Sequence, residues 1–200
     1  MRLISALAAA ALLASASAAS AVTVVGATNI HITNALGTYL QVAEVVATQF
    51  GTGLDKALAS QGGSASAPDA YAPGFSSPAK AIDGNNGGGY YTDTIYHSAG
   101  SGGFLDVTLA APTTLTSLTL YGRTDCCSER DLFTVSITNA GGTVLYSGNL
   151  DARATNSATV TFDAPTSVPE PASWALLVSG FAMVGAASRR RNRSTITVAA

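Results

Sequence analysis

Residues 104–122 read FLDVTLAAPTTLTSLTLYG, and apolar and polar side chains alternate along two runs of this stretch, 104–109 and 115–122. Alternation with many threonines and leucines is typical of β-strands that bury one face and expose the other. The intervening APTT has the composition of a turn. The stretch therefore predicts two strands of an antiparallel β-structure.

The same pattern returns further along the chain, in LFTVSIT (132–138), TVLYSG (143–148) and ATVTFDA (158–164). The sequence NAGG separates the first two of these runs and is a further turn signal. Residues 51–91 show no lasting period, and we expect a long ordered loop region there. Together these features predict an all-β fold of one domain, a β-sandwich of the jelly-roll kind.

Both ends of the chain differ from this body. Residues 1–21 join Arg2 to an apolar run and small residues, which predicts a signal peptide cleaved after Ala21. Near the other end, a Pro-Glu-Pro turn precedes a hydrophobic helix predicted over 172–188 and a cluster of four arginines, which should stay on the cytoplasmic side of the inner membrane. The predicted domain boundaries are 1–21 (signal peptide), 22–164 (β-sandwich), 165–168 (linker), 169–194 (sorting segment) and 195–200 (tail).

The negative charge of the body argues against polyanionic partners. Residues 22–168 contain five basic residues against eleven acidic ones, a net charge of about −6. A nucleic acid or an anionic membrane surface is therefore not expected to bind this domain.

Residues 123–130 read RTDCCSER and place the two cysteines of the chain side by side between two arginines. A disulfide between neighbours closes a small rigid ring, because adjacent Cα atoms lie about 3.8 Å apart. A rigid apolar plate between two guanidinium forks suits a sugar, which offers C–H groups to pack and hydroxyl groups to hold. The alternative is two reduced, buried thiols beside surface arginines paired to Asp125, Glu129 or Asp131.

The C-terminal order of motif, hydrophobic helix and arginine cluster resembles the PEP-CTERM sorting signal of Gram-negative bacteria. The resemblance implies recognition of Pro169, Glu170 and Pro171 by an exosortase, with cleavage nearby. It also implies a destination at the cell surface or in the extracellular matrix, often among exopolysaccharide. The alternative is an ordinary C-terminal anchor with an incidental Pro-Glu-Pro.

Two longer stretches, 81–100 (AIDGNNGGGYYTDTIYHSAG) and 102–130 ending in RTDCCSER, resemble the F-type lectins, or fucolectins. These belong to the discoidin-like, galactose-binding-like jelly rolls. The resemblance implies that His97, Arg123 and Arg130 hydrogen-bond the ring oxygen and axial hydroxyl of a fucose-like sugar, while Cys126 and Cys127 pack on a ring edge. Without the resemblance, a single loop histidine is more often structural.

In that family a closing strand supplies an acidic residue, whereas here 158–164 runs directly into the sorting segment. Residues 30–48 (IHITNALGTYLQVAEVVAT) resemble the closing hairpin, with Glu44 as the acidic residue. We therefore expect a circular permutation, in which the first strand pair occupies the place of the last. Neighbouring chain ends make such a permutation easy. The alternative is an unrelated amphipathic hairpin.

The resemblance also implies a structural calcium ion, which prefers six to eight oxygen ligands. The implied ligands are the side chains of Asp83, Asn85, Thr94 and Glu44 and the backbone carbonyls of Lys80 and Ala43. The alternative is an Asp-Gly-Asn turn without metal.

The leading hypothesis is therefore an exported module that binds carbohydrate, either a fucose-like sugar or units of an exopolysaccharide. The second is a structural matrix or adhesion protein with the same fold and a degenerate sugar site. An enzyme is not expected, because the sequence contains no metalloprotease motif, nucleophile elbow or Cys-x-x-Cys pair.

Overall fold

The computed structural model describes residues 22–165, 178–179 and 181–183. The predicted signal peptide, the Pro-Glu-Pro motif and most of the hydrophobic helix 172–188 lie outside these residues. Within the described ranges no helix is long and apolar enough to cross a membrane. A compact unit ends at Asp163.

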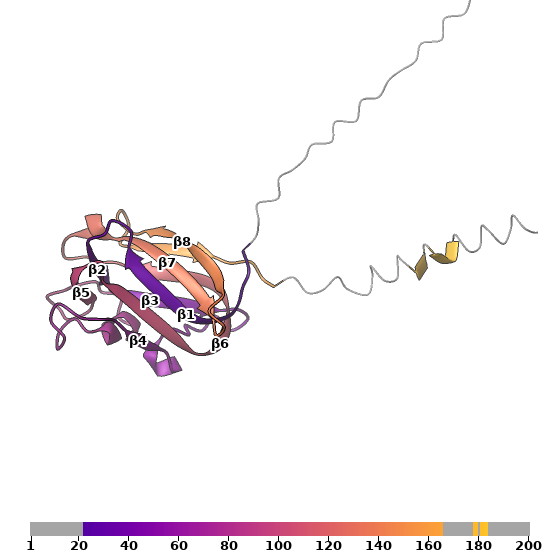
Figure 1. The fold of residues 1–200 in the computed structure, drawn as a ribbon, viewed down its shortest axis with the longest axis horizontal. Coiled ribbons are helices and arrows are strands. Elements are labelled where there is room, and N and C mark those ends of the chain that lie inside the picture. The colour runs from indigo at the N-terminus through magenta and orange to yellow at the C-terminus, as the bar shows by residue number, and fades with distance from the viewer. Residues whose placement is uncertain (1–21, 166–177, 180, 184–200) are drawn as a thin grey trace, which may run out of the picture. The chain divides into compact units, whose positions relative to one another are not determined.

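The described body is built of β-strands with three short 3-10 helices (Figure 1). In chain order the elements are β1 (Val24–Asn34), β2 (Tyr39–Val42), β3 (Glu44–Gln49), η1 (Ala59–Gln61), β4 (Ser64–Ser66), η2 (Pro78–Ile82), β5 (Tyr96–Ser101), β6 (Phe104–Tyr121), η3 (Ser128–Arg130), β7 (Leu132–Asn139), β8 (Val144–Asp151) and β9 (Ser157–Thr161). The expected loop region between β3 and β5 contains only η1, β4 and η2.

The stretch 104–122 forms one long strand, β6, where the alternation predicted two. Its first half pairs with β1 and β4, and its second half pairs with β3 and β9. Pairing with β1 persists through the predicted turn, where Ala27 lies opposite Thr113 and the register shifts. Pro112, which has no N–H to donate, lies within this bulged region, where proline is tolerated in a sheet. The strand therefore bends instead of ending.

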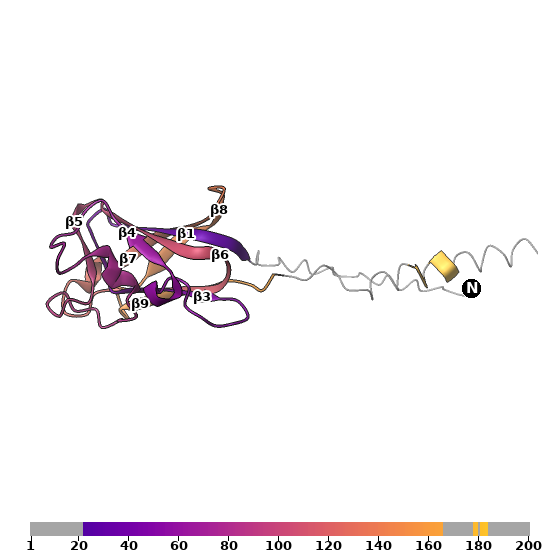
Figure 2. The ribbon, with the colours of Figure 1, turned by 90° about the horizontal axis from the view of Figure 1, so that it is seen from below.

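Because β6 bends, it belongs to both layers of a β-sandwich. One layer contains β4, the first half of β6, β1, β7 and β8, and the other contains β3, the second half of β6 and β9. All ladders between these strands are antiparallel. Figure 2 shows β1 and β4 above β3 and β9. Strands that pass from one sheet to the other are a known way to close the corner of a sandwich.

The hydrophobic core lies between the two layers and follows the alternation of the sequence. Fully buried side chains include Ile30, Leu105 and Val135 from one layer and Val45 and Leu118 from the other. Polar neighbours such as Thr119 beside Leu118 and Thr134 beside Val135 are more exposed. The prediction of an all-β sandwich of antiparallel sheets is thus confirmed.

The N-terminal strands differ from the expected closing hairpin. β1 pairs with β6 and β7, β3 pairs with β6, and β2 leaves both layers to pair with β5. Residues 30–48 therefore form no hairpin, because β2 is drawn into a separate two-stranded sheet. The permutation itself stays a prediction.

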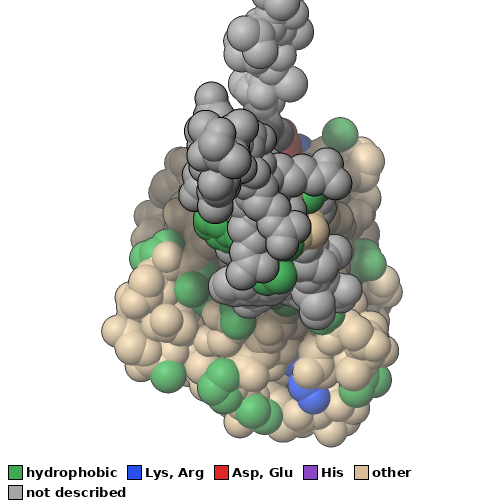
Figure 3. Space-filling view, turned by 90° about the vertical axis from the view of Figure 1, so that its right-hand side faces the viewer, with side chains coloured by type: hydrophobic (Ala, Val, Ile, Leu, Met, Phe, Trp, Pro, Cys, Tyr) green, Lys and Arg blue, Asp and Glu red, His purple; other side chains and the backbone are tan. Residues whose placement is uncertain are grey.

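The two ends of the body meet at one end of the sandwich. The backbone N–H of Asp163 donates to the carbonyl of Val22 at 2.9 Å. β2 and β5 lie at the opposite end (Figure 1). Figure 3 looks onto the end where the chain enters and leaves, and its visible part carries scattered hydrophobic groups and few charged ones.

Candidate functional site

A hollow of about 350 Å³ lies at the β2–β5 end of the sandwich. β5 contributes His97, whose Cα is paired with Gln41 on β2. The connection from β6 through η3 contributes the RTDCCSER stretch. The lining residues are His97, Arg123, Cys126, Cys127 and Arg130, together with Tyr39, Tyr71, Tyr90 and Tyr91. All five residues predicted to bind a sugar thus converge on one hollow.

His97 is buried and its protonation is determined by its surroundings. Its Nδ1 lies 2.8 Å from the carbonyl oxygen of Ser98, which can only accept, so Nδ1 carries the hydrogen. Burial lowers the pKa of His97, and the nearby Arg123 and Arg130 lower it further. The ring is therefore neutral at physiological pH and offers Nε2 as a hydrogen-bond acceptor.

Arg123 is buried and held on several sides. Its Nε donates to Asp125, its Nη1 lies 3.4 Å from the side-chain oxygen of Gln41, and its guanidinium lies 4.9 Å from the centre of the Tyr90 ring. A guanidinium stacked on an aromatic face in a partly desolvated site is favourable by about 1–2 kcal/mol. The side chain is thus fixed before any ligand arrives.

Arg130 is more accessible, with its side chain one-third exposed. Its Nε lies 3.4 Å from Glu129, and its guanidinium lies 5.7 Å from the centre of the Tyr39 ring. The ion pairs with Asp125 and Glu129 that the alternative hypothesis expected are therefore present. Arg123 and Arg130 form these ion pairs and also line the hollow.

The two cysteines lie at the rim of the hollow. Their sulfur atoms are within bonding distance of each other, Cys126 is exposed, and Cys127 is half-buried. The two cysteines are therefore not both buried, as the alternative expected. Cys127 has a φ of 61°, in the left-handed region, and directly precedes η3. The pair thus shapes the turn that presents Arg130.

Four tyrosines complete the hollow, and the sequence analysis missed them. Three of the rings surround His97, with centroid distances of 5.4 Å to Tyr39, 5.4 Å to Tyr71 and 5.5 Å to Tyr90. Tyr71 and Tyr91 are 61% and 78% exposed, which is unusual for aromatic side chains. Two adjacent tyrosines after a glycine run were a usable signal for Tyr90 and Tyr91. Tyr39 and Tyr71 come from separate segments and gave none.

The residues predicted to hold calcium lie around the turn that follows η2. A buried Glu44 on β3 accepts a hydrogen bond from the Gly84 N–H at 3.1 Å. Within the turn, Asp83 accepts from the Asn85 N–H at 2.9 Å, and Asn85 accepts from the Gly87 N–H at 3.0 Å. A Cβ added to Gly87 would lie 3.0 Å from Oδ1 of Asn85 and 3.7 Å from Oγ1 of Thr94, so these two oxygens are close together.

The fit of this turn to a cation depends on Glu44. Its Oε1 is buried and has no hydrogen-bond partner among the described residues. Burial raises the pKa of Glu44 to about 7. Lys80 turns its ammonium toward Asp93 at 3.1 Å, and Ala43 is buried beside Glu44. The described chain contains no group of three or more His, Cys, Asp or Glu side chains suited to a metal. Asn85, Thr94 and backbone carbonyls would have to complete the shell, and these hard oxygens fit calcium.

The buried carboxyl of Asp131 makes the free energy of unfolding depend on pH. It is fully buried under the site, its Oδ2 accepts from the Arg123 N–H at 2.8 Å, and burial raises its pKa to about 7. Between pH 4 and 7 the Asp131 carboxyl therefore keeps its proton in the folded state, whereas the unfolded chain has already released it. The stability that this proton contributes is lost as the pH rises through 7. We expect the free energy of unfolding in urea to be higher at pH 5.5 than at pH 7.5 by about 1–2 kcal/mol.

The Asp131→Asn variant is the matched control, because the amide oxygen keeps the bond from Arg123 and does not titrate. Its pH dependence should be weaker than that of the wild type at the same calcium concentration. Equal pH dependence in the two proteins would contradict the role of Asp131.

Residues 167–191, beyond the sandwich, match a known protein family. They carry the PEP-CTERM protein-sorting motif. The motif implies processing by an exosortase and export to a cell-surface or extracellular destination. The match confirms the predicted PEP-CTERM motif near the C-terminus, over residues 167–191.

The chain is also similar to Fucolectin-3 of Anguilla japonica, with 39% identity over 57 residues. The similarity covers 28% of this chain and 32% of the relative, so the chain spans about a third of the length of the relative it matches. No solved structure matches the chain significantly. The similarity to this lectin is thus a partial one.

Proposed function

We propose that this protein is an exported, non-catalytic carbohydrate-binding module whose preferred sugar is fucose-like. The observation that supports this most is the convergence of His97, Arg123, Arg130 and the Cys126–Cys127 pair on one hollow. These groups come from two segments of the chain separated by the whole of β6. The hollow is at the end of the sandwich opposite the chain ends.

The chemistry of the hollow matches that of a sugar hydroxyl, which both donates and accepts. His97 offers one acceptor, Nε2, and the two guanidinium groups offer only donors. A single hydroxyl can therefore donate to His97 and accept from an arginine at the same time. Because the histidine is neutral and the arginines are fixed by aromatic rings, little side-chain freedom is lost on binding.

The rest of the hollow supplies apolar contacts for the C–H groups of a sugar ring. Tyr90 and Tyr91 lie on the Arg123 side, and Tyr39 lies against Arg130. We propose that Cys126 and Cys127 form a disulfide in the exported protein and present a flat sulfur surface without a mobile side chain. Fucose has a methyl group where many hexoses have a hydroxymethyl group, which suits a hollow with this much aromatic surface. The name of the relative Fucolectin-3 supports the same choice of sugar.

We propose calcium as a structural cofactor. The side chains of Glu44, Asp83, Asn85 and Thr94 and the carbonyls of Lys80 and Ala43 would hold it. Its chemistry is charge neutralisation of the buried Glu44 carboxylate. The glycine-rich segment after this turn leads directly to Tyr90 and Tyr91, so a fixed turn also fixes one wall of the hollow.

The sorting motif supports a proposal for where the module acts. The hydrophobic segment 172–188 would hold the protein in the inner membrane until an exosortase processes it near 169–171. The module would then contact carbohydrate at the cell surface, including the exopolysaccharide of the cell.

Isothermal titration of the purified protein with L-fucose tests the proposal. We expect binding with a dissociation constant on the order of 0.1–1 mM, because one small hollow immobilises a small ligand. D-glucose, whose hydroxyl groups are arranged differently, is the matched control and should bind more weakly. Absence of binding to L-fucose and to a wider glycan panel, by protein shown to be folded, would favour the matrix-protein hypothesis instead.

A further inference from the structure

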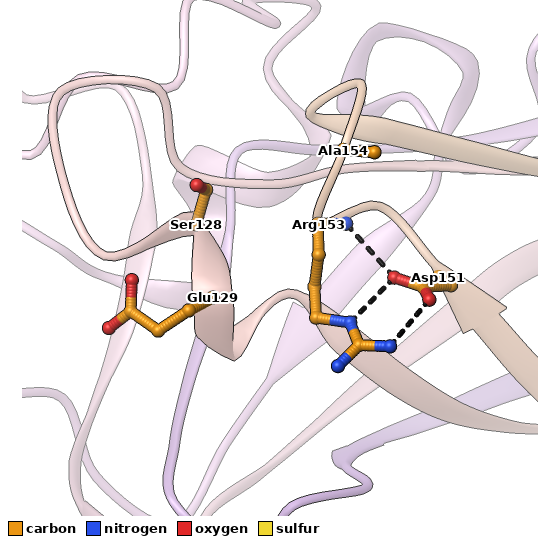
Figure 4. Close-up of a pocket in the computed structure, with 5 residues that line it drawn as sticks. All are labelled: Ser128, Glu129, Asp151, Arg153 and Ala154. Carbon is orange, nitrogen blue, oxygen red and sulfur yellow. Dashed lines mark hydrogen bonds and ion pairs between the residues drawn. The ribbon is translucent and has the colours of Figure 1, made fainter.

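A second hollow, of about 470 Å³, lies at the same end of the sandwich and shares η3 with the first. Ser128 and Glu129 of η3 line it on one side and Asp151, Arg153 and Ala154 on the other, with the Glu129 side chain directed away from Arg153 (Figure 4). Cys127 and Arg130, the residues on either side of that Ser-Glu pair, line the first hollow. A single short turn therefore separates the two hollows.

Arg153 is held in a fixed orientation in the second hollow. Its Nε and Nη2 donate to the two carboxylate oxygens of Asp151 at 2.8 and 2.7 Å, and its backbone N–H donates to the same side chain at 3.1 Å (Figure 4). Three of the five guanidinium N–H groups make no hydrogen bond to a described residue. A fixed fork with unused donors binds a ligand without first losing side-chain freedom.

The walls of the second hollow are tied to those of the first. The loop after β8 is bonded to the loop after β6 through two backbone contacts, Ala152 N–H to Asp131 O at 2.8 Å and Gly122 N–H to Asn156 O at 2.9 Å. The Asp131 N–H in turn donates to the carbonyl of Ser128 at 3.0 Å. The two hollows therefore keep a fixed separation.

That separation suits neighbouring units of one glycan. Cys127 and Arg130 line one hollow and Ser128 and Glu129 the other, so the two linings are neighbours in the chain, where adjacent Cα atoms lie about 3.8 Å apart. Ser128 can donate and accept, and Arg153 can donate, which is the mixture that a polyhydroxylated ring needs.

We propose that the second hollow binds the sugar unit next to the one in the first hollow, so that the protein recognises an oligosaccharide and not only a terminal sugar. This inference rests on the proposed function. The second unit is an uncharged sugar, because the lining combines one guanidinium with two carboxylates and would repel a uronic acid or a sulfated ring.

Titration of the full-length protein in detergent with L-fucose and with the two isomeric fucosyllactoses tests this inference. We expect at least one fucosyllactose to bind about tenfold more tightly than L-fucose, the gain of one or two additional charge-assisted hydrogen bonds. Arg153→Gln should remove that gain and leave the dissociation constant for L-fucose as it is. Lys56→Gln removes a cation that lines neither hollow and should preserve the gain.

Equal affinity for L-fucose and both fucosyllactoses would overturn the second subsite and leave the proposed function standing. A gain that survives Arg153→Gln would overturn it as well, as would an Arg153→Gln variant that weakens L-fucose binding to the same degree. Failure of the wild-type protein to bind any of the three sugars would instead reject the proposed function, and the second subsite with it.

Discussion

Replacing Arg123 by alanine is expected to weaken L-fucose binding by at least about a hundredfold, to below the limit of calorimetric detection. Arg123 is buried between Asp125, Gln41 and the ring of Tyr90, so its guanidinium reaches the hollow already oriented. Its removal deletes the charged donors and also leaves Asp125 without its main partner. Calorimetric titration of the wild type and the variant measures the difference.

Because Arg123 is buried, the alanine variant must be shown to fold, by circular dichroism and thermal unfolding. Arg130→Ala provides a second measurement at a side chain that is one-third exposed and whose guanidinium lies near Glu129 and the ring of Tyr39. Lys56→Ala removes a positive charge that lines neither hollow and should bind L-fucose as the wild type does. Unchanged affinity in both arginine variants would contradict the assignment of the site.

Calcium is expected to raise the thermal unfolding midpoint by roughly 10 °C when its concentration exceeds the dissociation constant about a hundredfold. The physical reason is the Glu44 carboxylate, which is buried with one oxygen unpartnered among the described residues. A cation at this oxygen removes the cost of keeping the charge away from water. Differential scanning calorimetry in calcium chloride and in EDTA measures the shift.

Glu44→Gln should abolish most of this shift, since the amide keeps the bond from Gly84 but carries no charge. Asp106→Asn removes a carboxylate that pairs with His31 on the outer face of the sheet, and it should respond to calcium as the wild type does. Magnesium, which is smaller and demands a regular octahedral shell, should have less effect. A full calcium response in Glu44→Gln would reject the proposed ligand set.

Much of the fold could be predicted from the alternation of apolar and polar residues. The two errors of that prediction have a common cause. β7, β8 and β9 were predicted close to their observed bounds, because apolar side chains of each pack against the core. β6 was predicted as two strands, and residues 30–48 as a hairpin. In both cases the outcome depends on a distant partner, β1 for the bend of β6 and β5 for the diversion of β2. The residues of a segment alone do not show which distant strand it will pair with.

The candidate site shows the same division. The resemblance of the octapeptide and of residues 81–100 named His97, Arg123, Arg130 and the cysteines, which lie together at one hollow. Tyr39 and Tyr71 could not be found in this way, because β2 and the loop before η2 bring them to the hollow from separate segments. The Asp151–Arg153 pair lies in a segment that suggests only a turn.

The meeting of Val22 and Asp163 at the end opposite the hollow has a mechanical consequence. A pull between a bound sugar and the chain beyond Asp163 would run nearly parallel to β9, which starts beside Tyr121 near the hollow and ends toward Asp163. The hydrogen bonds between β9 and β6 would then be loaded together in shear and would not open one after another from an end. A module built in this way should hold its ligand under tension, as a cell-surface attachment to a polymer requires.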